Sequence, residues 1–149
     1  MTHRIVLYAA AAMLALGCSV PAVASTLSLN AVLLGGNECI GGPTCAQGDL
    51  DAFGVASITL PNAATICFSI LVERVDPPTA AHIHAGVATV NGGIVVPLAP
   101  PATGNPGASS GCVASPAGFN KALVKDPAAF YVNVHTGAFP NGAMRGQVF

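Results

Sequence analysis

The residues best suited to chemistry are three histidines in two short segments. His82 and His84 lie in the sequence AHIHAG, residues 81–86, and His135 lies in YVNVHT, residues 131–136. Alternate residues of a β-strand point to the same side, so His82 and His84 share a face, and His135 joins them if the two strands are neighbours. Imidazole nitrogens are common ligands of copper and zinc. The pattern therefore predicts one small copper or zinc site.

The same histidines also have a purely structural interpretation, in which they hydrogen-bond a loop or each other without a metal. Asn133 shares a face with His135 and is a candidate supporting residue. Arg145 has two interpretations as a supporting residue. Either it steers an anion toward a metal, or it anchors a turn or pairs with a carboxylate such as Glu73 or Asp76.

The N-terminus has the pattern of a secretory signal peptide. A basic start precedes an apolar run over residues 5–16, and Ala22-Val23-Ala24 supplies the small residues that signal peptidase recognises. Cleavage after Ala24 would leave residues 25–149 as one secreted or periplasmic domain. An alternative is a lipoprotein signal that ends at an acylated Cys18. No later run has the length of a transmembrane helix.

Cysteines of the exported part predict a disulfide framework. Cys39, Cys45, Cys67 and Cys112 remain after cleavage, and an even number in an exported chain indicates two disulfides, with three possible pairings. Cys39 and Cys45 flank a Gly-Gly-Pro turn, which favours pairing them and leaves Cys67 with Cys112. A structural zinc site at the cysteines is disfavoured because the spacing lacks C-x-x-C pairs.

The low charge of the chain argues against some classes of protein. Charged residues make up only 7% of the sequence and the formal net charge is −1, with no basic stripe, so nucleic acid is not an expected partner. No phosphate-binding loop is present, and no catalytic residue is predicted. The natural partner, a protein or a small ligand, is not indicated.

Short alternating segments separated by turn residues predict an all-β fold. A brief helix is expected after Ser115-Pro116, through Val124, with Ser115 as its N-cap, and a single helical turn at Asp126–Ala129. Residues 99–110 are expected to form a loop. We predict a Greek-key β-sandwich or barrel of about seven or eight strands. The expected strands are residues 26–34, 50–60, 65–72, the segment around His82, 94–96, a short one from Cys112, 131–136 and 143–149.

Several motifs together resemble the chordin-type (CHRD) domain, and the likeness covers nearly all of the exported part. Their order and spacing both agree with that family. The motifs are AHIHAG at 81–86, NGGIVVPL at 91–98, SGCV at 110–113, YVNVHT at 131–136 and FPNGAMRGQ at 139–147.

This resemblance implies an extracytoplasmic β domain of immunoglobulin-like or superoxide-dismutase-like type. It also implies a faint similarity to copper/zinc superoxide dismutase, where an H-x-H strand and a later strand histidine bind copper, as His82, His84 and His135 could. The histidines of the bridging and zinc positions are lacking, so a dinuclear site is excluded. Two hypotheses follow: a non-catalytic binding or structural module, or a mononuclear copper or zinc protein with weak superoxide-dismutase-like chemistry.

Overall fold

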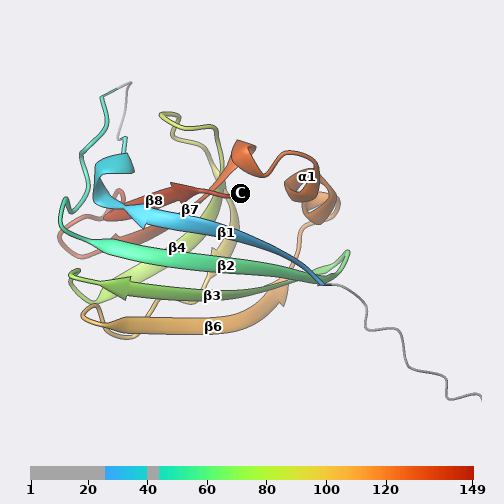
Figure 1. The fold of residues 1–149 in the computed structure, drawn as a ribbon, viewed down its shortest axis with the longest axis horizontal. Helices are drawn as coiled ribbons and strands as arrows, with labels where there is room; N and C mark the ends of the chain where they lie inside the picture. The colour runs from blue at the N-terminus through green and yellow to red at the C-terminus, as the bar shows by residue number, and fades with distance from the viewer. Residues whose placement is uncertain (1–25, 40–43) are drawn as a thin grey trace, which may run out of the picture.

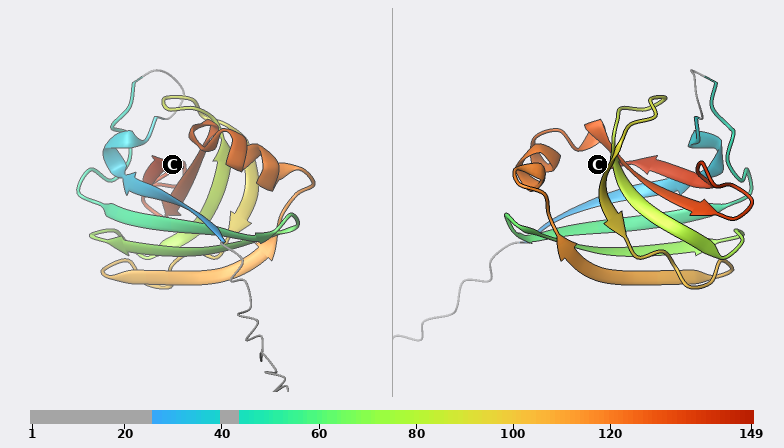
Figure 2. Two further views of the ribbon diagram at one scale, coloured as in Figure 1. Left: turned by 45° about the vertical axis from the view of Figure 1, so that its right-hand side comes forward. Right: turned by 180° about the vertical axis from the view of Figure 1, so that it is seen from behind.

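The computed structural model describes residues 26–39 and 44–149, where eight antiparallel strands form a single sheet. The sheet curls into a nearly closed barrel, which confirms the predicted all-β class (Figure 1 and Figure 2). The predicted signal peptide, with the alternative at Cys18, lies outside the described residues. The strands are β1 (Leu27–Leu34), β2 (Phe53–Asn62), β3 (Thr65–Glu73), β4 (Pro78–Ala85), β5 (Ile94–Leu98), β6 (Gly107–Ala114), β7 (Phe130–Thr136) and β8 (Met144–Gln147).

Strand order is what brings the two histidine segments together. The order in the sheet is β5-β4-β7-β8-β1-β2-β3-β6, so β4 and β7 are hydrogen-bonded neighbours although they are far apart in the sequence. β1, β2 and β3 form a meander of two antiparallel pairs. The end strands β5 and β6 approach each other where Ser109 Oγ donates to the carbonyl oxygen just beyond β5, that of Ala99, at 2.9 Å.

The barrel interior is filled by one side of each strand. Ile66, Phe68, Ile70 and Val72 alternate along β3 and are all buried, as a strand with one face on the core requires. Ile83 of β4 and Val132 and Val134 of β7 join the same apolar cluster. Residues next to them in β4 and β7, including all three histidines, therefore project from the outer side of the barrel.

A short helix covers one end of the barrel. α1 (Phe119–Lys125) buries Phe119 and Leu123 in the core cluster, and Figure 2 shows it beyond the strand ends. The expected N-cap is wrong: Gly118 is the N-cap, and Ser115 instead donates to Asn120, whose amide holds the β2–β3 turn through the carbonyls of Asn62 and Thr65. Two short 3₁₀ turns also occur, η1 (Gly35–Asn37) and η2 (Pro127–Ala129). Among the described helices, none has the length and apolar character needed to cross a membrane.

β6 corrects the expected loop at residues 99–110. This strand starts at Gly107, five residues before Cys112, and pairs with β3 from Gly107 to Ala114. Its small residues, glycine, alanine and serine, have weak strand propensity, so the sequence gives little sign of it. Pairing with the regular strand β3 determines the conformation instead.

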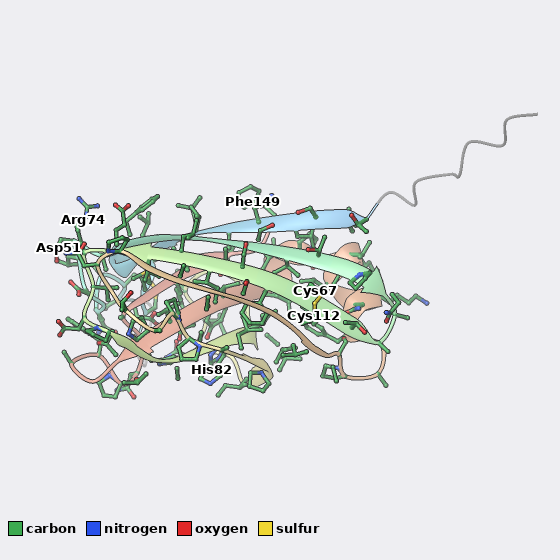
Figure 3. All side chains as sticks on the ribbon, turned by 90° about the horizontal axis from the view of Figure 1, so that it is seen from below. Asp51, Cys67, Arg74, His82, Cys112 and Phe149 are labelled. Atoms are coloured by element: carbon green, nitrogen blue, oxygen red, sulfur yellow. A yellow bond between two sulfur atoms is a disulfide. The ribbon has the colours of Figure 1, made fainter. Side chains whose placement is uncertain are left out.

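Both disulfides of the favoured pairing are present, Cys39–Cys45 and Cys67–Cys112. Cys67 and Cys112 stand directly opposite each other in the β3–β6 pair, and Figure 3 shows the bridge between these strands. Because the cysteines are oxidised, they do not form the zinc site that was considered as an alternative. The bridge fastens an end strand of the sheet to its neighbour.

Candidate metal centre

The three histidines meet on the outer face of the β4–β7 pair. His82 pairs with Asn133, His84 with Tyr131, and His135 with Ala80, so all of these side chains leave the sheet on the same side. His84 is buried with 8% of its surface exposed, whereas His82 and His135 are half-buried. Figure 3 shows where His82 leaves the barrel.

The ring nitrogens of the cluster converge. One ring nitrogen from each of His82, His84 and His135 lies within 4.8 Å of the other two. Nδ1 of His82 and Nε2 of His135 are 3.2 Å apart. A point common to the three atoms lies within roughly 2.8 Å of each, against about 2.0–2.1 Å for a zinc–nitrogen bond, so small side-chain movements would close a site. The cluster could therefore hold a metal ion.

Backbone carbonyls orient two of the three imidazoles. His84 Nδ1 donates to the carbonyl oxygen of Gly92 at 3.0 Å, and His135 Nδ1 donates to that of Pro140 at 3.1 Å. A carbonyl can only accept a hydrogen bond, so Nδ1 carries the proton in both rings and Nε2 carries the lone pair. Metal-binding histidines are commonly oriented in this way by a hydrogen bond from the other ring nitrogen.

Nε2 of His84 is the exceptional atom of the cluster. It is buried and has no hydrogen-bond partner. Leaving such an atom unsatisfied costs about 1–3 kcal/mol, and buried polar groups without partners are rare in folded proteins. By contrast, Nε2 of His135 accepts a hydrogen bond from Nδ1 of His82.

The environment keeps the imidazoles neutral, which is the form that binds metals. Burial, and then the neighbouring His135 and His84, lower the pKa of His82 to about 4. Burial also lowers the pKa of His84, as does the charge of Arg145, against the opposing hydrogen bond to Gly92. For His135, burial lowers the pKa more than its bond to Pro140 raises it.

A buried polar group adjoins the histidines on the same outer face. Glu38, 1% exposed, accepts a hydrogen bond from Asn133 Nδ2 at 2.7 Å, and Asn133 also donates to the carbonyl of Met144. Burial raises the pKa of Glu38, although the charge of Arg145 and the Asn133 bond partly offset this. Asn133 therefore holds the loop that carries Glu38, and within the described part of the chain no hydrogen bond joins it to a histidine.

Arg145 is a turn anchor, which is one of its predicted roles, and its hydrogen-bond partners do not include Glu73 or Asp76. It is 2% exposed, too deep to steer anions at the surface. Its Nε donates to the carbonyl of Asn37, and Nη1 donates to the carbonyl of Val90 and to Asn91 Oδ1. Its guanidinium lies 4.6 Å from the centre of the Tyr131 ring. Tyr131 belongs to β7, which lies between β8, the strand of Arg145, and β4, the strand of His82 and His84.

Several residues around the cluster were not singled out by sequence reasoning. Tyr131 stacks on His84, with ring centres 4.9 Å apart and planes 9° apart, and its hydroxyl accepts a hydrogen bond from the Gly92 amide at 3.2 Å. Gly92 and Pro140 act through backbone carbonyls, which leave no side-chain signal. Alternation along residues 131–136 places Tyr131 on the same face as His135, and this was the clue that the sequence offered.

The fold and the site together define a disulfide-bonded antiparallel β-barrel domain with a three-histidine cluster on its outer face. Residues 29–148 match the family model described as the CHRD domain, and the chain belongs to that family. No curated protein matches the chain. Similarity to superoxide dismutase is not among these findings and stays a prediction. The disulfides are consistent with an oxidising, extracytoplasmic location.

Proposed function

We propose that this protein is an exported, non-catalytic CHRD module that binds one copper or zinc ion through His82, His84 and His135. The observation that carries the proposal is the unpartnered, buried Nε2 of His84. One ring nitrogen from each of the three histidines lies within 4.8 Å of the other two, and Nδ1 of His84 is already engaged with the Gly92 carbonyl. A bound cation would satisfy the unpartnered Nε2, whereas the purely structural interpretation leaves it unexplained.

The donor set indicates which metals to test. Three neutral imidazoles suit zinc with one open position, and they suit copper equally well. Copper binds more tightly than zinc to a given set of nitrogen ligands. We therefore expect a 1:1 complex with either ion and a higher affinity for Cu(II).

The test is a metal titration of the oxidised protein. Cu(II) and Zn(II) binding would be measured by competition with a chromophoric chelator, for the native protein and for His82→Ala, His84→Ala and His135→Ala variants. Ser57→Ala is the control, because β2 lies four places from β4 in the strand order. The native protein and the control should bind one ion, and each histidine variant should lose that binding while it keeps its β-sheet circular dichroism spectrum.

Electron paramagnetic resonance of the Cu(II) complex would identify the ligands. Nitrogen hyperfine structure from imidazoles is expected, and it should change in each histidine variant. Equal metal uptake by the native protein and a variant that lacks all three histidines would refute the proposal. The protein would then be a CHRD module whose histidines form a structural polar cluster.

A further inference from the structure

The β4–β5 connection, residues 86–93, hydrogen-bonds the histidine cluster through Gly92. The carbonyl oxygen of Gly92 accepts the Nδ1 proton of His84. This hydrogen bond decides which nitrogen of His84 carries the lone pair, because a neutral imidazole has one proton to place. The position of residues 86–93 therefore controls whether Nε2 of His84 is available to a cation.

Two side chains outside the connection, those of Tyr131 and Arg145, hold the residues around Gly92 in place. The Gly92 amide donates to Tyr131 Oη at 3.2 Å, so Gly92 is held through its N–H by the same ring that stacks on His84. Arg145 Nη1 donates to Val90 O at 3.2 Å and to Asn91 Oδ1 at 3.1 Å, which fixes the residues just before Gly92.

Close packing leaves residue 92 little freedom. A Cβ atom at Gly92 would overlap the backbone carbonyl of Ala85, so only glycine lets the connection approach β4 this closely. Gln147 Nε2 donates to Gly86 O at 3.0 Å and secures the beginning of the connection. The beginning of the connection is thus tied to β8 through Gln147, and its end is tied to β7 through Tyr131.

We infer that Tyr131 and Arg145 are positioning residues of the histidine cluster, which hold residues 86–93 so that the Gly92 carbonyl keeps His84 protonated at Nδ1 and open at Nε2. Neither side chain needs to touch the ion. The role in metal binding rests on the proposed function, but the orientation of His84 exists in the metal-free protein and is measurable there.

Two readouts test the inference. The first is the tautomer of His84 in the metal-free protein, read from ¹⁵N chemical shifts and two-bond couplings of the imidazole. The second is the affinity for Zn(II). Native protein should show His84 as the Nδ1–H tautomer. Tyr131→Phe keeps the ring and removes the hydroxyl, and Arg145→Lys keeps the charge and removes the planar fork.

Each variant should populate the Nε2–H tautomer of His84 and bind Zn(II) about tenfold more weakly, the lower range for loss of an outer hydrogen-bond partner of a metal ligand. Asn91→Ala, an exposed position, should produce a smaller shift in the same direction. The Asn91→Ala variant still tests the inference if the variant at Tyr131 or Arg145, both of which are buried, fails to fold. Ser109→Ala is the matched control, because it also deletes one hydroxyl that bonds the backbone, and it should change neither readout.

The possible failures are distinguishable. Folded Tyr131→Phe, Arg145→Lys and Asn91→Ala variants with the native tautomer and native Zn(II) affinity would overturn the inference. The native protein could bind no metal while the variants still change the tautomer of His84. That result would refute the proposed function and leave the positioning role intact.

Discussion

At the scale of single residues, the cluster combines three neutral imidazoles with two backbone carbonyls that orient them. Ordinary histidines have a pKa near 6.5, so a site built from them begins to compete with protons close to neutral pH. Here burial lowers the pKa of all three histidines, and that of His82 to about 4. Protons should therefore compete with a metal only in more acidic solution.

This gives a prediction for the pH dependence of metal binding. Three unperturbed histidines would each be half protonated at about pH 6.5, which would weaken binding roughly eightfold there. With lowered pKa values the imidazoles are less protonated at that pH, so the loss of Zn(II) affinity between pH 8 and pH 6.5 should be clearly smaller than eightfold. The affinity should then fall as the pH approaches the pKa of His82, about 4. Chelator competition across this range is the measurement, and an eightfold loss already at pH 6.5 would contradict the prediction.

The turn between β7 and β8 packs against the buried Glu38. Gly142, in the turn between β7 and β8, has a φ of 138°, and a Cβ atom there would overlap the Glu38 carboxylate. A substitution would strain the backbone and also separate Glu38 from Asn133. An Asn-Gly pair such as Asn141-Gly142 is typical of a turn, but its packing against Glu38 joins residues far apart in the chain and has no local signal.

Gly142→Ala should therefore destabilise the fold by roughly 2–5 kcal/mol, from backbone strain and a disrupted buried hydrogen bond. Gly137→Ala is the matched control in the same connection, since nothing lies near a Cβ atom at that position. Urea denaturation of the two variants beside the native protein measures the difference. Equal stability of both variants would show that the turn does not position Glu38.

Among the elements, β6 depends most on a covalent link. Its small residues contribute little to the core, and it is hydrogen-bonded to one neighbour, β3. The bridge Cys67–Cys112 closes a separation of 45 residues, and Cys39–Cys45 closes one of 6. Loop entropy gives about 4 kcal/mol for the longer bridge and about 2 kcal/mol for the shorter one.

We expect the Cys67→Ser/Cys112→Ser variant to lose up to about 4 kcal/mol of unfolding free energy, and Cys39→Ser/Cys45→Ser up to about 2 kcal/mol. The longer bridge limits the unfolded chain more, which is the reason for the order. Denaturant titrations of the two double variants under the same conditions provide the comparison. A larger loss from the Cys39 and Cys45 pair would mean that this bridge stabilises the fold mainly through native contacts around Glu38.

For the whole molecule, the parts that followed from the sequence are those with a regular period or a specific motif. Alternation predicted β1, β3 and β7, and the grouping of His82, His84 and His135 followed from alternation together with the family resemblance. β6 was misjudged because pairing with β3 overrides its composition. A turn-anchoring role for Arg145 was one of its predicted interpretations, but the residues that it holds could not be predicted, because the positions of those turns depend on the whole barrel.

The contribution of the disulfides to stability predicts that the domain is more stable when it folds in an oxidising compartment. Together they contribute up to about 6 kcal/mol by loop entropy, comparable to the total stability of about 5–15 kcal/mol for an ordinary domain. We predict that protein made with residues 1–24 is exported, begins at Ser25 and weighs four hydrogen atoms less than the reduced chain. Protein made without residues 1–24 in a reducing cytoplasm should unfold at a markedly lower temperature.

Intact mass spectrometry and thermal unfolding of the two preparations measure both effects, with reoxidation of the cytoplasmic sample as the control. Reoxidation should restore the higher unfolding temperature, because the sequence of the domain is the same. A mature N-terminus at an acylated Cys18 would replace the signal peptidase site by lipoprotein processing. Equal thermal stability of reduced and oxidised protein would show that the barrel core alone is sufficient, and that the bridges do not confine folding to an oxidising compartment.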